Sequence, residues 1–127
     1  MNTERLIEGA EFLEQLELKA GDEFDINRFI EHDCGTAACA LGWMAIHELF
    51  GLMEIGDGIK LRHTDWAGFS AAQVVFDITR AEVKWLFLGM NYPYTHQGVS
   101  KEMVAARMRW LAAGGTIDTP KEDDDAG

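Results

Sequence analysis

The longest apolar segment of the chain is TAACALGWMAIHELF, residues 36–50. Its apolar side chains would cover nearly every side of a helix, which is typical of a helix buried all round. Thr36 is a suitable N-cap and Gly51 can end the helix, so we expect a central core helix over residues 37–50. Small residues recur on one side of it: Ala38, Gly42 and Ala45. This strip would let a neighbouring backbone approach closely.

Local patterns on both sides of this segment predict further helices. Helical spacing of apolar residues predicts helices over residues 3–18, 26–31, 66–76 and 101–113. Their N-caps would be Thr3, Asp25, Asp65 and Ser100. Thr79 and Glu82 form a capping box for one more helix, which Gly89 would close.

A change of period predicts one β element in the middle of the chain. Between residues 53 and 63, apolar and polar residues alternate around Gly56-Asp57-Gly58, which indicates a short β-hairpin. The expected fold is therefore mostly α: a compact single-domain bundle of five to six helices with one small β-hairpin. With 127 residues, 47% of them hydrophobic, the chain has core material for one domain. We expect a helical domain over residues 1–115 and a disordered acidic tail over residues 116–127.

The composition is strongly acidic. The chain has 22 acidic and 11 basic residues, a formal net charge of −11. This charge excludes electrostatic attraction to nucleic acid or to an anionic membrane, and it favours a protein partner with a basic surface. The sequence shows neither a secretory leader nor a run of about 18–20 apolar residues, so we expect a cytoplasmic protein.

The excess negative charge is concentrated near the N-terminus, where residues 1–33 hold ten acidic and three basic residues. In the first predicted helix, acidic residues follow one another at helical spacing: Glu4, Glu8, Glu11 and Glu14. We interpret this row as a candidate partner-binding surface, since carboxylates about 6 Å apart lie along one side of a helix. The alternative is a solvated helix face that serves solubility alone. Duplex DNA carries one charge per about 1.7 Å of axis, so the row by itself is too sparse to imitate DNA.

The predicted loop over residues 91–98 offers Tyr92 and Tyr94 as a second candidate partner-binding element, because tyrosine-rich loops often supply aromatic anchors. The alternative is that the tyrosines cover the edge of the core. A small basic group follows and is expected to lie on a solvated helix face: Lys101, Arg107 and Arg109. The tryptophans are expected in the core or at its edge: Trp43, Trp66, Trp85 and Trp110.

Both cysteines of the chain lie in HDCGTAAC, residues 32–39. Cys34 would precede a helix N-terminus, which lowers the pKa of a thiol, so a Cys34-dependent hydrolase or transferase is one hypothesis. The structural alternative is that Cys34 and Cys39 are small buried residues. The scattered histidines lack the paired spacing of zinc ligands. We therefore expect no catalytic residue, no metal and no other cofactor.

The segment CGTAACALGW, residues 34–43, resembles the motif C-G-T-x-x-C-x-x-G-W of an uncharacterised family of short proteins from phages, prophages and bacterial genomes. The likeness continues in FDITRAEVKWLF, residues 76–87, and SKEMVAARMR, residues 100–109, and spans about residues 30–112. The resemblance implies no catalytic activity and no bound cofactor. It implies the context of a small accessory protein, encoded by a virus.

Together these features predict a function by binding. We expect a small acidic, non-enzymatic, phage-type accessory protein that binds and inhibits a host nucleic-acid-handling or defence complex through its acidic surface, as anti-CRISPR or anti-restriction proteins do. Two alternatives are a cysteine-dependent enzyme using Cys34 and a structural or assembly role in a phage particle.

Overall fold

The computed structural model describes residues 1–32, 36–93 and 98–117. These residues form five α-helices: α1 (Thr3–Gln15), α2 (Ala40–Ile46), α3 (Phe69–Phe76), α4 (Arg80–Phe87) and α5 (Lys101–Ala112). Within the same residues there are five short strands: β1 (Glu23–Phe24), β2 (Ile30–His32), β3 (Thr36–Ala38), β4 (Leu52–Ile55) and β5 (Gly58–Leu61). Two 3-10 turns follow α2 and α4: η1 (Leu49–Gly51) and η2 (Gly89–Asn91).

The strands form two separate sheets. The first has the order β1-β3-β2, with β1 parallel and β2 antiparallel to β3. The second is the antiparallel hairpin β4-β5, which confirms the hairpin expected from the alternating pattern. The mostly α bundle with a single hairpin is nevertheless wrong, because the described residues form a mixed α/β fold with two sheets.

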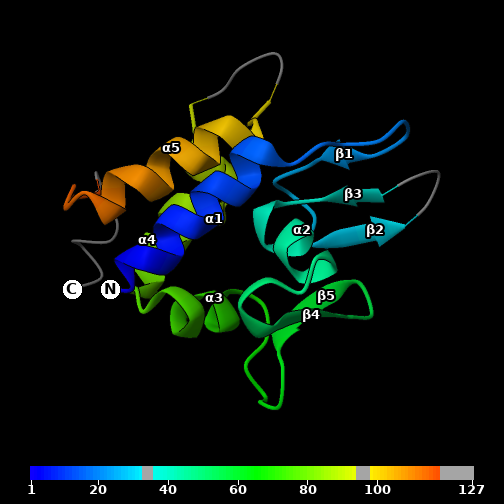
Figure 1. The fold of residues 1–127 in the computed structure, drawn as a ribbon, viewed down its shortest axis with the longest axis horizontal. Coiled ribbons are helices and arrows are strands. Elements are labelled where there is room, and N and C mark those ends of the chain that lie inside the picture. Colours follow the sequence, from blue (N-terminus) through cyan, green and yellow to red (C-terminus); the bar gives the residue numbers. More distant parts are fainter. Residues whose placement is uncertain (33–35, 94–97, 118–127) are drawn as a thin grey trace.

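Figure 1 shows how these elements are arranged. Helices α1 and α5 lie side by side at one end of the molecule, and the three-stranded sheet lies at the other end. Helix α2 stands between them, and the hairpin packs against it. Helix α3 lies close to the start of α1, so its C-terminal end meets the N-terminal end of α1.

Helix α2 occupies the core, and every residue from Ala40 to Ala45 is buried. The helix predicted over residues 37–50 is therefore right in its burial and wrong in its extent. Thr36 is not an N-cap: residues 36–38 form β3, and Cys39 takes the N-cap position without a side-chain hydrogen bond. Strand pairing explains the difference, because the backbone of residues 36–38 pairs with β1 on one side and β2 on the other instead of forming a first helical turn.

The helix predicted over residues 26–31 is also wrong. Asp25 does act as an N-cap would, since its Oδ1 accepts a hydrogen bond from the Asn27 backbone N–H at 3.0 Å. The backbone then makes one turn, in which the Arg28 N–H donates to the Asp25 carbonyl at 3.1 Å. The Arg28 carbonyl accepts from the Cys39 N–H at 2.7 Å, and the chain continues into β2 instead of a helix.

Helix α3 begins later than predicted because the preceding segment pairs with β5. The Leu61 N–H donates to the Trp66 carbonyl at 2.9 Å, and the Gly68 N–H donates to the Ile59 carbonyl at 3.0 Å. The N-cap is therefore Gly68, at φ +58°, and not Asp65. Trp66 is left 53% exposed, so its expected place in the core is wrong.

The remaining predicted helices are confirmed, with small shifts at their ends. Helix α1 is capped by Asn2 instead of Thr3. Thr79 and Glu82 form the expected capping box at the start of α4: the Glu82 N–H donates to Thr79 Oγ1 at 3.1 Å, and the Thr79 N–H donates to Glu82 Oε1 at 2.8 Å. Ser100 caps α5 as expected.

The end of the described chain continues to contact α5. The Trp110 indole N–H donates to the Thr116 carbonyl at 2.8 Å, and Ile117 is half-buried against the core. Trp110 itself is 53% exposed, which departs from its expected core position, whereas Trp43 is buried as expected. Most of the predicted acidic tail, residues 118–127, lies outside the described residues.

Candidate functional site

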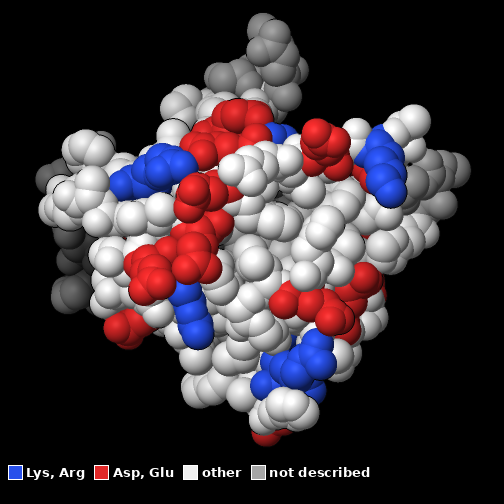
Figure 2. All heavy atoms as spheres, viewed as in Figure 1, with Lys and Arg blue, Asp and Glu red and all other residues white. Residues whose placement is uncertain are grey.

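Helix α1 presents carboxylates on its outer side. Its inner side is buried in the core and is formed by Leu6, Gly9, Ala10 and Leu13. The outer side carries Glu4, Glu8 and Glu11, which are exposed and spaced i, i+4, i+7. We call these three residues the acidic face. Figure 2 shows acidic side chains following the line of α1 across this side of the molecule.

Glu14, the fourth residue of the predicted row, is also exposed but has a partner within the protein. Its two carboxylate oxygens accept hydrogen bonds from Arg109 on α5, at 2.7 and 2.9 Å. The hydrogen bond from Arg109 holds the pKa of the Glu14 carboxyl below its ordinary value of 4.5. The pair therefore stabilises the fold above the unfolded pKa, and this contribution is lost as the pH falls through the lower, folded pKa. Glu14 links two helices, so we leave it out of the acidic face.

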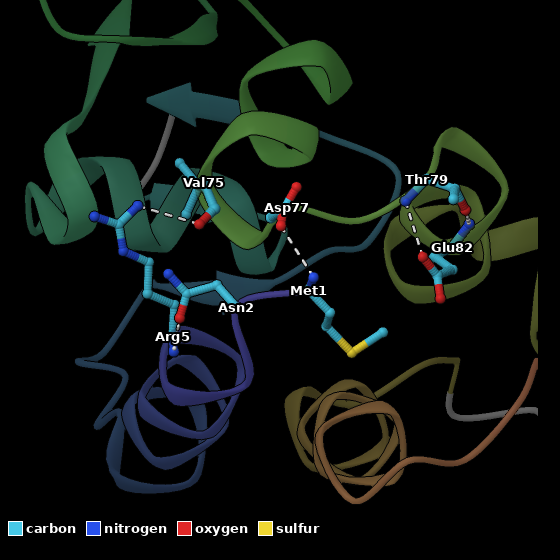
Figure 3. A network of polar contacts seen from close by, with 7 residues as sticks. All are labelled: Met1, Asn2, Arg5, Val75, Asp77, Thr79 and Glu82. Carbon is cyan, nitrogen blue, oxygen red and sulfur yellow. Dashed lines mark hydrogen bonds and ion pairs between the residues drawn. The ribbon is translucent and has the colours of Figure 1, made fainter.

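The N-terminal end of α1 is fixed to the C-terminal end of α3, as Figure 3 shows. Asn2 makes one hydrogen bond within α1 and one to α3. Its Oδ1 accepts from the Arg5 N–H at 3.0 Å, and its backbone N–H donates to the Phe76 carbonyl at 2.8 Å. The Arg5 guanidinium donates to the Val75 carbonyl at 3.1 Å. The Met1 ammonium lies 3.0 Å from Asp77 Oδ2. The side chain of Arg5 is thus turned toward α3 and away from the acidic face.

The C-terminal end of α1 is held by α5. The Lys101 ammonium donates to the Leu13 carbonyl at 2.7 Å and to the Glu14 carbonyl at 3.4 Å, where a helix end carries partial negative charge. Lys101, expected on a solvated helix face, is instead half-buried and caps another helix. Because both ends of α1 are fixed, the acidic face has a defined orientation before any partner binds.

Tyr92, the first aromatic candidate for partner binding, is buried and not displayed. Its hydroxyl donates to the Leu86 carbonyl at 2.6 Å, and burial raises the pKa of this hydroxyl. The Arg107 guanidinium lies over its ring, 3.6 Å from the centroid, and over the Trp85 ring at 4.4 Å. Tyr94, the second candidate, lies outside the described residues.

Arg107 departs from the solvated position expected for it. Its guanidinium donates to the Trp85 carbonyl at 2.6 Å and to the Asn91 carbonyl at 3.0 Å. Together with the two aromatic rings, these contacts make Arg107 a connection between α5, α4 and η2. No sequence pattern distinguishes this role. Arg107 and Arg109 are two residues apart on the same helix, yet they have different partners.

The described cysteine has the environment of a packing residue. Cys39 is 3% exposed, and burial raises the pKa of its thiol to about 11. Cys34 lies outside the described residues. Two residues earlier in the sequence, the His32 ring lies between two partners, with Nδ1 3.0 Å from Thr36 Oγ1 and Nε2 2.9 Å from Glu54 Oε2. In residues 1–32, 36–93 and 98–117 there is no group of three or more potential metal ligands.

We expect Cys39 to resist alkylation in the native protein. In a Cys34→Ser variant, a thiol with a pKa of about 11 has roughly one thiolate in a thousand molecules at pH 8, and its burial also blocks the reagent. Iodoacetamide labelling followed by mass spectrometry should show little modification at pH 8 in buffer and complete modification in denaturant. Rapid labelling without denaturant would contradict the burial of Cys39.

One surface pocket lies outside the candidate sites predicted from the sequence. It has a volume of about 420 Å³ and lies between the segment before α3 and the outer side of α3. Its lining residues are Trp66, Ser70, Gln73, Val74, Asp77 and Ile78. Helical spacing is the signal that could have found it, because Trp66, Ser70, Gln73 and Asp77 recur at i, i+4, i+7 and i+11.

None of the helices in the described part of the chain is long and apolar enough to cross a bilayer. Comparison of the sequence and structure with protein-family models, curated proteins and solved structures finds no match. The geometry of the acidic face is therefore the basis for a proposal of function.

Proposed function

We propose that this protein is a non-enzymatic, phage-type accessory protein that acts in the host cytoplasm by binding and inhibiting a nucleic-acid-handling or defence complex. The proposed target is of the kind that anti-CRISPR and anti-restriction proteins inhibit. The observation that carries the proposal is the acidic face: Glu4, Glu8 and Glu11 are exposed on a helix whose two ends are fixed. Its partner would be a Lys- and Arg-rich surface that otherwise holds nucleic acid.

Physical chemistry supports this use of the acidic face. From Glu4 to Glu11 the helix rises by about 10 Å, so three carboxylates meet a basic surface over two turns. A net charge of −11 steers such a surface toward the protein and raises the association rate. A helix that is already fixed loses little conformational freedom on binding, which leaves more of the interaction free energy as affinity.

The experiment is an inhibition assay in bacterial strains that each carry one restriction or CRISPR system. The efficiency of plasmid transformation is measured with the wild-type protein and with a variant carrying Glu4→Lys, Glu8→Lys and Glu11→Lys. We expect the wild type to restore transformation in a susceptible strain and the variant to fail, because reversed charges repel a basic surface. Helicity measured by circular dichroism should be unchanged, since Lys and Glu have similar helix propensities.

A matched control variant distinguishes the effect of the acidic face from the effect of net charge. Glu23, Asp57 and Asp65 are exposed and lie outside α1, and their replacement by lysine changes the charge by the same amount. We expect this control variant to inhibit as the wild type does. Equal inhibition by the acidic-face variant, or equal loss in the control variant, would contradict the proposal.

A further inference from the structure

The C-terminal end of α3 already binds two positive groups of the protein itself. The Met1 ammonium pairs with Asp77 at 3.0 Å, and the Arg5 guanidinium donates to the Val75 carbonyl at 3.1 Å. The last carbonyls of a helix carry partial negative charge, which favours cations at this position. The same helix end forms one wall of the pocket of about 420 Å³ that Trp66 and Asp77 line.

Asp77 has capacity for a further cation. Its side chain is 81% exposed, and only Oδ2 takes part in the pair with Met1. Figure 3 shows that the other carboxylate oxygen of Asp77 points away from Met1. An ionised carboxylate has about four lone-pair sites on its two oxygens, so a second donor can bind without displacing the first.

Trp66 supplies the second element of a cation site. Its indole is 53% exposed and lines the same pocket as Asp77. A guanidinium is planar and weakly hydrated, and it stacks on an indole while it donates hydrogen bonds to a carboxylate. Val74 and Ile78 provide apolar contacts for the methylene groups of a long side chain, and Ser70 and Gln73 provide polar ones.

We propose that this pocket binds an arginine side chain of the partner protein. The inference rests on the proposed function, because it assumes a partner with a basic surface, and it adds a defined contact at the end of α3. Glu4 lies in the first turn of α1 and Asp77 at the C-cap of α3, and the Asn2 N–H to Phe76 carbonyl hydrogen bond joins these helix ends, so the pocket lies near the start of the acidic face. The acidic face attracts the basic surface electrostatically, and the pocket adds one defined contact at the protein surface.

The test uses the full-length protein and a small probe, N-acetyl-arginine-N′-methylamide, whose only charge is the guanidinium. The matched neutral probe is the corresponding citrulline derivative. Binding is followed by the amide and indole N–H signals of Trp66 and the amide signal of Asp77 in ¹H–¹⁵N NMR spectra. We expect saturable shifts of these signals with the arginine probe, with a dissociation constant of about 1–10 mM, and no saturation with citrulline.

Three variants make the assignment specific. Asp77 has φ 52° and ψ 56°, a conformation that asparagine tolerates, so Asp77→Asn should keep the backbone and weaken binding about fivefold or more. Trp66→Leu should abolish the shift of the Asp77 signal. Trp110→Leu is the matched control, because Trp110 is equally exposed, at 53%, and lies outside the pocket; it should bind as the wild type does.

Several outcomes would overturn this assignment. Equal binding of the citrulline probe would identify a pocket for neutral polar ligands, and unchanged binding by Asp77→Asn would remove the carboxylate from the site. Absence of any shift with the arginine probe would also overturn it. None of these results depends on the inhibition assay, so failure of the pocket and failure of the acidic face are distinguishable.

Discussion

Replacing Gly42 by alanine is expected to destabilise the protein by about 3 kcal/mol or more, measured as the free energy of unfolding in urea. A Cβ atom at this position would lie 1.6 Å from the Phe29 carbonyl oxygen and 2.9 Å from the Ala38 Cβ. The first obstacle is backbone, so a side-chain rotation cannot relieve it. Alanine favours a helix over glycine by only about 1 kcal/mol, and the steric cost therefore decides the sign. Gly42→Leu should be more severe still.

Gly58→Ala is the matched control for this experiment. Gly58 does not have a positive φ, and its added Cβ would meet the Ile55 carbonyl oxygen at 3.6 Å, an ordinary contact. We expect its free energy of unfolding to remain within about 1 kcal/mol of the wild type. If Gly42→Ala were as stable as Gly58→Ala, the close approach of α2 to the segment before β2 would be wrong.

Replacing Arg107 by methionine should cost about 2 kcal/mol of folding free energy. The variant keeps an apolar stem over Trp85 and Tyr92 but removes the donors to the Trp85 and Asn91 carbonyls. Hydrogen bonds from a charged donor contribute about 1.5–3 kcal/mol each where water is excluded, and the half-buried position of Arg107 reduces that contribution. The measurement is again the urea unfolding free energy.

Arg109→Met controls for the loss of one positive charge from the same helix. Arg109 is exposed, and its partner Glu14 is exposed as well, so solvent screens their interaction. We expect the Arg109 variant to be clearly more stable than the Arg107 variant. Equal stability of the two would show that the carbonyl contacts of Arg107 contribute nothing beyond a surface ion pair.

The sequence predicted the elements that are determined by residues close together in the chain. Thr79 and Glu82 lie within one helical turn of each other, and the box they form needs no distant partner. The hairpin β4-β5 likewise has both strands within ten residues and Gly56 at φ +60° in its turn. Helix α1 could be predicted from the spacing of its buried leucines, although Asn2 is its cap.

The elements that the sequence missed depend on strand pairing that their residue types do not indicate. Ala37 and Ala38 have side chains that suit a helix, but their backbones pair with β1 and β2. Asp25 binds the Asn27 N–H in the manner of a helix cap, and this local arrangement ends in a turn because the Arg28 carbonyl is taken by Cys39. Equivalent local chemistry therefore precedes either a helix or a strand, and tertiary pairing determines which one forms.

The candidate site could be predicted in part. Helical spacing alone places Glu4, Glu8 and Glu11 on one exposed side of α1. It could not show that Glu14 belongs to a pair, because Arg109 is 95 residues away along the chain. Nor could it show that the Arg107 guanidinium of α5 lies over the ring of Tyr92.

The fixed position of α1 has a consequence for synthesis on the ribosome. Helix α1 is made before α5, but its C-terminal end is held by Lys101 of α5, 88 residues later in the chain. Until α5 has been made, the inner side of α1 lacks its main covering, and the nascent chain exposes Leu6 and Leu13 to water or to chaperones. Closure of this long loop is a late event, since contacts between distant residues form slowly. Chains that terminate before α5 therefore carry the glutamates of the acidic face without their fixed orientation.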